Sequence, residues 1–288
     1  MKFLKRNFPW KNTTDPYHIL VSEVMLQQTQ VSRVLIKYPI FISQFPNFKE
    51  LAEASIKDIL VAWQGMGYNR RALYLKKIAE IIVTQYKSKL PDDPVILDSF
   101  PGIGKATAAS IVAFAFNKPV VFIETNIRRV FLHLFFEDRD SKVDDREILP
   151  LIGKTLDKKN PREWYWALMD YGAHLGKTVD NPNKKSKHYS IQSKFEGSDR
   201  QVRGEILRIL LKKSQSKKEL IQTLKKEKIR VEKIINELIK DQFIFYKKGR
   251  YNIMGSCLSL RAKHIIAKQS IETIRLPRSI LSTSIRSQ

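Results

Sequence analysis

Two glycines flank a single residue in the stretch Phe100-Pro-Gly-Ile-Gly-Lys-Ala-Thr-Ala108, and an apolar helix is predicted to follow. Gly102 and Gly104 permit positive φ angles or a close backbone approach, while Pro101 fixes the entry to the turn. The first turn of the helix directs free backbone N–H groups and the positive end of its dipole at an anion. Such a turn binds phosphate without reading sequence, although an ordinary corner between two helices has the same pattern.

A second stretch, Glu23-Val-Met-Leu-Gln-Gln-Thr-Gln-Val31, carries one carboxylic acid beside side-chain amides of a size that can enter a base stack. An isolated acid near amides of this kind is suited to work on a nucleotide base that has left the duplex. Together with the phosphate-binding turn, it suggests an enzyme that excises a base from DNA.

Apolar residues recur at helical spacing through the first 180 residues, and strand-like alternation is nearly absent there. The predicted fold is therefore mainly α. A first helical stretch is predicted over 16–38, and Pro39 and Pro46 are expected to interrupt the helical pattern after it. Further helices are predicted at 48–54, 56–63, 70–86, 106–116, 127–136, 147–155 and 162–174.

The composition turns polar and basic after residue 180, which predicts a linker over 181–199. Helices are then predicted at 201–212, 217–227 and 231–241, followed by strands at 243–247 and 249–253. This order is typical of a winged-helix module over 200–255, whose basic turn with Lys247, Lys248 and Arg250 would contact DNA phosphates. A module that docks a protein has the same pattern. Residues 256–288 form a tail without a clean period, and their structure stays open.

The chain carries 52 Lys and Arg against 29 Asp and Glu, a net charge of +23, which makes a polyanion the expected partner. The excess lies mostly near the end, because residues 181–288 contain 26 basic and 9 acidic residues, a net +17.

A single cysteine, Cys257, excludes an internal disulfide framework, and the sequence has no Cys/His cluster to bind zinc or an iron–sulfur cluster. No apolar run reaches the length of a signal peptide core or a membrane span. We therefore expect a soluble cytoplasmic protein, associated with the nucleoid. Its only candidate cofactor is a monovalent cation held by carbonyl groups of the glycine turn.

Six motifs follow one another in residues 1–176, namely Pro9-Trp10, the stretch ending at Val31, Gly65-Met-Gly-Tyr68, the glycine turn, Asn126-Ile-Arg-Arg-Val130 and Ala167-Leu-Met-Asp-Tyr-Gly-Ala173. In this order they resemble the helix-hairpin-helix DNA glycosylase superfamily, and within it the adenine DNA glycosylase branch. The resemblance implies a glycosylase core over 1–180 that acts in base excision repair, with two helical lobes, a cleft between them and the glycine turn on one lip. It implies a partner that is double-stranded DNA containing a mismatched or damaged base, bound by a monomer. It also implies hydrolysis of the N-glycosidic bond of adenine opposite 8-oxoguanine or guanine, after the base is flipped out.

The resemblance assigns the general acid to Glu23, which protonates a ring nitrogen of the extruded adenine. It assigns the second carboxylate, which stabilises the oxocarbenium-like sugar, to Glu124, where the family normally carries aspartate. The extra methylene moves this carboxylate by roughly 1.5 Å, so either the backbone compensates or activity falls. Asn126 matches the asparagine that supports these acids by hydrogen bonds, although a helix N-cap is its simplest alternative.

Ala106 stands where bifunctional relatives such as endonuclease III carry a nucleophilic lysine, so the resemblance implies a glycosylase without lyase activity. Gln27, Gln28 and Tyr68 match residues that fill the stack once a base has swung out. Further DNA contacts are predicted for hairpin and basic residues, namely Arg70, Gly102, Gly104, Lys105, Thr107 and Arg128.

Two features depart from the family pattern. Relatives continue from the core into four cysteines that hold an iron–sulfur cluster, whereas no cysteine follows Gly176 before Cys257. The family's domain that reads oxidised guanine has no visible counterpart, and the predicted winged helix stands in its place. The sequence therefore leaves two alternatives open: a glycosylase for thymine or uracil opposite guanine, and a DNA-binding protein without catalytic activity.

Overall fold

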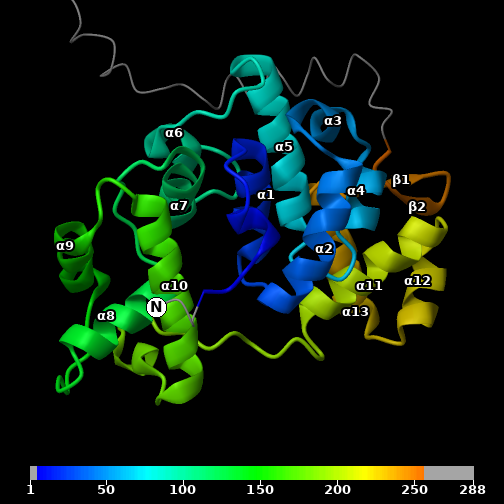
Figure 1. Cartoon of the computed structure of the whole chain (residues 1–288). Coiled ribbons are helices and arrows are strands. Elements are labelled where there is room, and N and C mark those ends of the chain that lie inside the picture. The colour runs from blue at the N-terminus through cyan, green and yellow to red at the C-terminus, as the bar shows by residue number, and fades with distance from the viewer. Residues whose placement is uncertain (1–4, 256–288) are drawn as a thin grey trace, which may run out of the picture.

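The computed structural model describes residues 5–255, and its fold is mainly helical, as predicted (Figure 1). The tail at 256–288, with Cys257, lies outside the described residues. Within the described range, no helix is both long and apolar enough to cross a membrane. The core elements are η2 (Pro9–Lys11), α1 (Pro16–Leu26), α2 (Val31–Gln44), α3 (Phe48–Glu53), α4 (Ile56–Ala62), α5 (Arg70–Gln85), α6 (Pro94–Asp98), α7 (Lys105–Phe116), α8 (Thr125–Phe135), α9 (Asp145–Thr155), α10 (Pro161–Thr178) and η3 (Pro182–Lys185).

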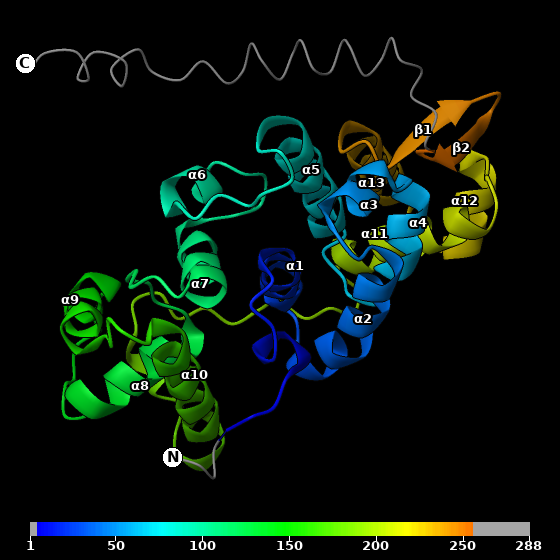
Figure 2. The same cartoon turned by 45° about the horizontal axis from the view of Figure 1, so that its top comes forward.

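Two hydrophobic cores organise these helices, and Figure 2 shows α8, α9 and α10 set apart from α2 to α5. The first core holds buried side chains of α1 to α7, among them Leu20, Trp63 and Leu75. The second holds buried side chains of α8 to α10, among them Phe131 and Tyr165. Helix α7 contributes to both cores and α1 packs along it. The junction of the two cores therefore lies at α1 and α7.

Helix α2 passes through Pro39, so the predicted interruption at this residue was wrong. Pro39 lies on the exposed face, where solvent can hydrate the Leu35 carbonyl that loses its helical N–H partner. Buried residues on the opposite face attach the helix to the first core on both sides of the proline. The break comes earlier instead, at 27–30, where Gln28 has a φ of 52°.

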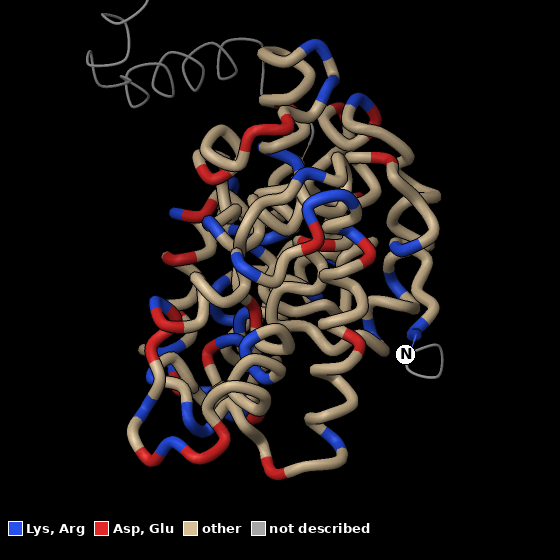
Figure 3. Tube along the Cα trace, turned by 60° about the vertical axis from the view of Figure 1, so that its left-hand side comes forward, with Lys and Arg blue, Asp and Glu red and all other residues tan. Residues whose placement is uncertain are grey.

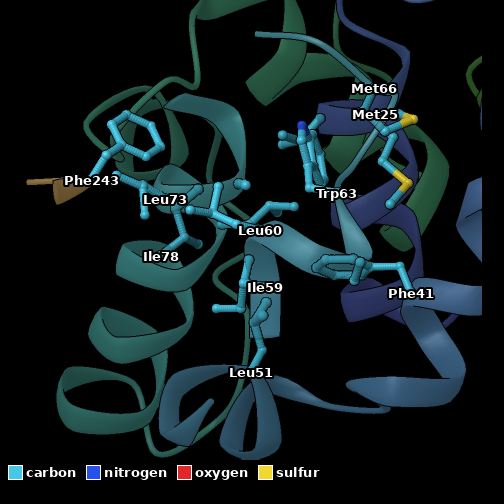
Figure 4. Close-up of a cluster of buried hydrophobic side chains, with 14 of the residues drawn as sticks. Met25, Phe41, Leu51, Ile59, Leu60, Trp63, Met66, Leu73, Ile78 and Phe243 are labelled. Carbon is cyan, nitrogen blue, oxygen red and sulfur yellow. The ribbon is translucent and has the colours of Figure 1, made fainter. Parts of the chain in front are cut away.

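Three helices and a hairpin follow the core: α11 (Asp199–Lys212), α12 (Lys217–Leu224), α13 (Lys228–Lys240), β1 (Ile244–Lys247) and β2 (Arg250–Ile253). This is the order of elements that the sequence predicted. The two strands pair antiparallel, and Lys248 and Gly249 in their turn have φ angles of 48° and 78°, as a type I′ turn needs. Phe243 lies beside Leu73 of α5 in the first core (Figure 4), so this C-terminal module packs against the core.

Candidate active site

Glu23 is carried by α1, whose start is fixed by Asp15 and Pro16. The Asp15 carboxylate accepts hydrogen bonds from the backbone N–H groups of Tyr17 at 2.8 Å and His18 at 3.3 Å. Pro16 takes the first helical position, where a backbone N–H would have no partner within the helix, so its absence costs no hydrogen bond. Most residues of α1 are buried, so Glu23 projects from a rigid helix at the junction of the two cores.

The carboxyl group of Glu23 faces α7, where Ser110 Oγ lies 2.5 Å from Glu23 Oε2. Burial disfavours the charged form and raises the pKa of Glu23 to about 7, although the Ser110 hydrogen bond acts in the opposite direction. The negative charge of Glu124 raises this pKa further. A carboxyl group that holds its proton near neutral pH is suited to proton donation.

Glu124 is the N-cap of α8. Its Oε1 accepts from the backbone N–H groups of Asn126 at 2.7 Å and Ile127 at 2.9 Å, and its Oε2 accepts from the Asn126 side-chain amide at 3.3 Å. Burial raises the pKa of Glu124, while these backbone donors and the nearby Arg128 and Arg129 act against that rise. The carboxylate therefore lies at the positive end of the helix dipole with donors on both oxygens.

Asn126 links Glu124 to the rest of the second core. Its side-chain oxygen accepts from Arg129 Nη1 at 3.0 Å, and the same nitrogen donates to the Gly172 carbonyl of α10 at 2.6 Å. A Cβ atom at Gly172 would lie 2.2 Å from the Asn126 carbonyl oxygen, so only glycine permits this helix crossing. Helix α10 thus holds the start of α8 and, through it, the Glu124 carboxylate.

The two carboxyl groups come from different cores, since α1 packs mainly in the first and α8 in the second. The charge of Glu124 acts on the pKa of Glu23, which means that the two groups lie within electrostatic reach of each other. Two surface hollows of about 470 and 210 Å³ are lined by other residues and include neither glutamate. Neither hollow is therefore part of the candidate active site, which is identified from the hydrogen bonds and charges of the two glutamates.

The glycine turn lies between α6 and α7. Gly102 has a φ of +74°, and a Cβ atom there would lie 2.3 Å from the Tyr74 ring, so the turn accepts only glycine at this position. Gly104 is the N-cap of α7. The side-chain amide of Gln27 donates to the Gly102 carbonyl at 3.1 Å and to Thr107 Oγ1 at 3.2 Å. The segment that follows α1 is thereby attached to the turn.

Nine of the twelve residues predicted to contact DNA fall into two groups. One group is exposed, and it comprises Gln28, Gly102, Gly104, Lys105, Lys247 and Lys248. The other group is paired with carboxylates of the protein: Arg70 with Asp241 at 2.7 Å, Arg128 with Asp145 through bonds of 2.7 and 2.6 Å, and Arg250 with Glu219 at 3.0 Å.

Tyr68 ends the Gly-Met-Gly turn in a left-handed conformation, with a φ of 44°. Its ring lies near two guanidinium groups, 5.5 Å from that of Arg71 and 5.1 Å from that of Arg200. Its hydroxyl group also contacts Gln192, in the segment that leads into the C-terminal module, and Arg200, in α11 of that module. The residue predicted to enter the base stack is therefore held by the C-terminal module and by the connection to it.

Sequence reasoning missed the roles of two residues that prove central to this arrangement, Arg71 and Ser110. Ser110 had a signal, because it is the only polar residue in the apolar run 108–116. For Arg71, which follows Arg70, the sequence predicted a phosphate contact or a solvated charge, and both expectations were wrong. It is only 6% exposed, and its guanidinium donates to six acceptors, the carbonyls of Val24, Met25, Gln27, Met66 and Gly67 and the Thr29 hydroxyl.

The short turn η3 holds both ends of α8. Asn183, which is buried, donates to the Thr125 carbonyl at 3.1 Å, directly beside Glu124. Lys185 Nζ donates to carbonyl groups just beyond the other end of the helix, those of Phe136 and Arg139, each at 3.4 Å. The start of α8 is thus fixed from two sides, by η3 and by α10.

Comparisons with known proteins agree with this geometry. The family model of HhH-GPD superfamily base excision DNA repair proteins matches residues 21–150. The adenine DNA glycosylase of Mycobacterium tuberculosis (strain ATCC 25618 / H37Rv) is 33% identical over 71% of this chain and 74% of that protein. The adenine DNA glycosylase of Mus musculus is 29% identical over 70% of this chain and 41% of that protein. A solved thermostable thymine-DNA glycosylase matches with a TM-score of 0.53 and 25% identity, over 63% of this chain and 85% of that one.

Proposed function

This chain belongs to the helix-hairpin-helix superfamily of base excision DNA repair proteins, within it to the adenine DNA glycosylases, and we propose that it removes adenine paired with 8-oxoguanine or guanine. It is a DNA N-glycosylase, which hydrolyses a base–sugar bond. One observation carries the proposal: the negative charge of Glu124 acts on Glu23, and the two carboxyl groups have different hydrogen-bond partners.

The surroundings of the two carboxyl groups favour different roles. Burial and the charge of Glu124 keep the pKa of Glu23 at about 7, so much of this group carries its proton at neutral pH. Burial raises the pKa of Glu124 as well, but N–H donors on both of its oxygens and the nearby Arg128 and Arg129 act against that rise. Glu23 has the single opposing donor Ser110. Two carboxyl groups set apart by their environments can serve as acid and anion in one reaction.

The reaction then proceeds from these roles. Glu23 delivers its proton to a ring nitrogen of the flipped adenine, the bond from that base to C1′ breaks, and neutral adenine leaves with the bonding electron pair. The Glu124 carboxylate stabilises the cationic sugar that forms. Water adds to C1′, and its proton returns to the Glu23 carboxylate, which restores the acid.

Duplex DNA is held at several points in this proposal. The N–H groups of the glycine turn and Lys105 bind phosphate, and the exposed Gln28 fills the space left by the adenine. Figure 3 shows Lys and Arg spread over the described trace, with Asp and Glu between them, and basic residues at many places suit a long contact with phosphates. Lys247 and Lys248 extend that contact to the C-terminal module. The enzyme works as a monomer on DNA of the nucleoid.

The iron–sulfur cluster carried by relatives does not fit the residues of this chain. Such a cluster needs four cysteine thiolates, and Cys257 is the only cysteine. Among residues 5–255, no three His, Cys, Asp or Glu side chains gather to hold a metal. We propose that the enzyme works without the cluster. We propose a monovalent cation at the glycine turn as the only cofactor. One of its candidate ligands, the Gly102 carbonyl oxygen, already accepts a hydrogen bond from the Gln27 side chain.

A panel of duplexes tests the proposal. Strand cleavage after alkali should follow incubation with A:8-oxoguanine and A:G duplexes, and Glu23→Gln should abolish it while duplex affinity is kept. Turnover only on T:G or U:G duplexes would replace adenine with a pyrimidine as substrate. No abasic product from any duplex, with unchanged binding by Glu23→Gln, would leave a DNA-binding protein.

The absence of lyase chemistry has its own test. Ala106 offers no amine at the position that bifunctional relatives use, so no Schiff base should form with the abasic sugar. Borohydride should therefore trap little or no covalent complex with an abasic strand. Efficient trapping would refute the monofunctional assignment and point to Lys105 or another lysine as the nucleophile.

A further inference from the structure

Ser110 lies between the acid and the backbone of the hairpin helix. Its side chain is buried on α7, and its Oγ lies 2.5 Å from Glu23 Oε2 and 3.0 Å from the Thr107 carbonyl oxygen. Both distances are within the range of O–H···O hydrogen bonds. One hydroxyl group therefore has two oxygen partners, of which the carbonyl can only accept.

The number of hydrogen atoms limits how these contacts can coexist. The Ser110 hydroxyl has one hydrogen and can also accept. When Glu23 is protonated, the acid donates to Ser110, and Ser110 donates to Thr107. When Glu23 is ionised, Ser110 must turn its hydrogen to the carboxylate and release the carbonyl. Rotation of one hydroxyl group thus gives Glu23 a partner in either protonation state.

We propose that Ser110 is a positioning residue for the acid, holding the Glu23 carboxyl in one orientation both before and after proton delivery. This inference rests on the proposed function, in which Glu23 must be an acid first and a carboxylate after the base has left. Without Ser110, the buried carboxylate would have no hydrogen-bond donor among the described residues. Its rotamer would then be free to change between the two steps.

Other charged groups do not take over this role. Among the elements packed against α1, Arg71 of α5 binds carbonyl groups, Lys11 of η2 binds Asp170, and Arg33 of α2 and Lys105 of α7 are exposed. Glu124 of α8 is the charge that acts on Glu23, and it raises the pKa of the acid. The bond donated by Ser110 acts against this rise. Its removal should therefore move the Glu23 pKa upward.

Single-turnover excision by the full-length protein, measured from pH 5 to pH 9, tests the inference. Ser110→Ala should slow excision at pH 7 about 10-fold, and the alkaline fall in rate should move up by about one pH unit. Ser110→Thr, which keeps the hydroxyl group, should restore the profile of the wild type. Ser22→Ala is the matched control, because Ser22 is a buried helical serine bonded to its own helix at Ile19 and to no carboxylate.

A second readout needs no substrate. Carbon NMR of labelled glutamate, assigned with Glu23→Gln, should show Glu23 titrating at higher pH in Ser110→Ala than in the wild type. An unchanged titration, or equal effects of Ser110→Ala and Ser22→Ala on rate, would overturn the inference. If the wild type excises no base at all, the proposed function fails, while the NMR titration still reports on Ser110.

Discussion

The side-chain amide of Gln27 donates to the carbonyl oxygen of Gly102 at 3.1 Å. This bond fixes the end of α1, which carries Glu23, against the glycine turn. Under the proposed function it therefore keeps the proton donor at a fixed distance from the bound DNA backbone. Gln27→Ala should lower the rate of excision at saturating DNA about 10-fold, or ~1.4 kcal/mol. Single-turnover kinetics measures this, with exposed Gln30→Ala as the control. A rate equal to that of the control would show that the offset does not depend on this bond.

Glu23 should destabilise the fold at neutral and alkaline pH. Its pKa rises from 4.5 to about 7 on folding, because burial disfavours the charge. The native state therefore binds more protons than the unfolded state between these values, and stability falls as pH rises through that window. Glu23→Gln should increase the free energy of unfolding at pH 8 by about 3 kcal/mol, and by little at pH 4.

Urea denaturation at the two pH values checks this expectation. Glu53→Gln, at an exposed glutamate, is the control and should change stability little at either pH. The same gain for Glu23→Gln at pH 4 and pH 8 would mean that the effect comes from packing and not from ionisation.

Charge and length at Glu124 should have separable effects. Glu124→Gln keeps the shape but loses the anion, so excision should fall about 100-fold or more, and α8 should lose about 1 kcal/mol of dipole stabilisation. Glu124→Asp keeps both the charge and a favoured N-cap, so we expect activity within about 10-fold of the wild type. Excision rates and melting temperatures of both variants measure this. Equal activity of Glu124→Gln and Glu124→Asp would show that the negative charge at this position does not contribute to the reaction.

The buried guanidinium of Arg71 should be needed for folding. Arg71→Met fills similar volume but leaves carbonyl groups at the end of α1 and in the Gly-Met-Gly turn without donors, which should lower the free energy of unfolding by ~3 kcal/mol. Arg71→Lys should fail to rescue it, because one ammonium group cannot span these acceptors. Thermal and urea denaturation, with exposed Arg33→Met as the control, give the comparison. A loss no greater than that of the control would contradict this role.

Features with a local cause were predictable from the sequence. Gly102 needed a positive φ, Lys248-Gly249 matched a two-residue turn, and the main helices followed their apolar periods. Features with a distant cause were not. Tyr68 meets Arg200 across 132 positions, and nothing near either residue indicates the other. Helix α6 was missed because its five residues are too few for a period to emerge.

The same difference between local and distant causes explains why the candidate site was only partly predictable. Motif resemblance named both glutamates, but the bond between Ser110 and Glu23 spans 87 positions and depends on how closely α1 packs on α7. Pro39 shows the reverse error, since a strong local signal was overridden by burial of the opposite helix face.

The hydrogen bonds from η3 to the two ends of α8 use amide, ammonium and carbonyl groups. None of these groups exchanges electrons with small oxidants or reductants, and none can be stripped away by a chelator. The geometry of the Glu124 carboxylate should therefore persist through oxidative stress and iron starvation, the conditions under which damaged guanine accumulates or metal supply fails.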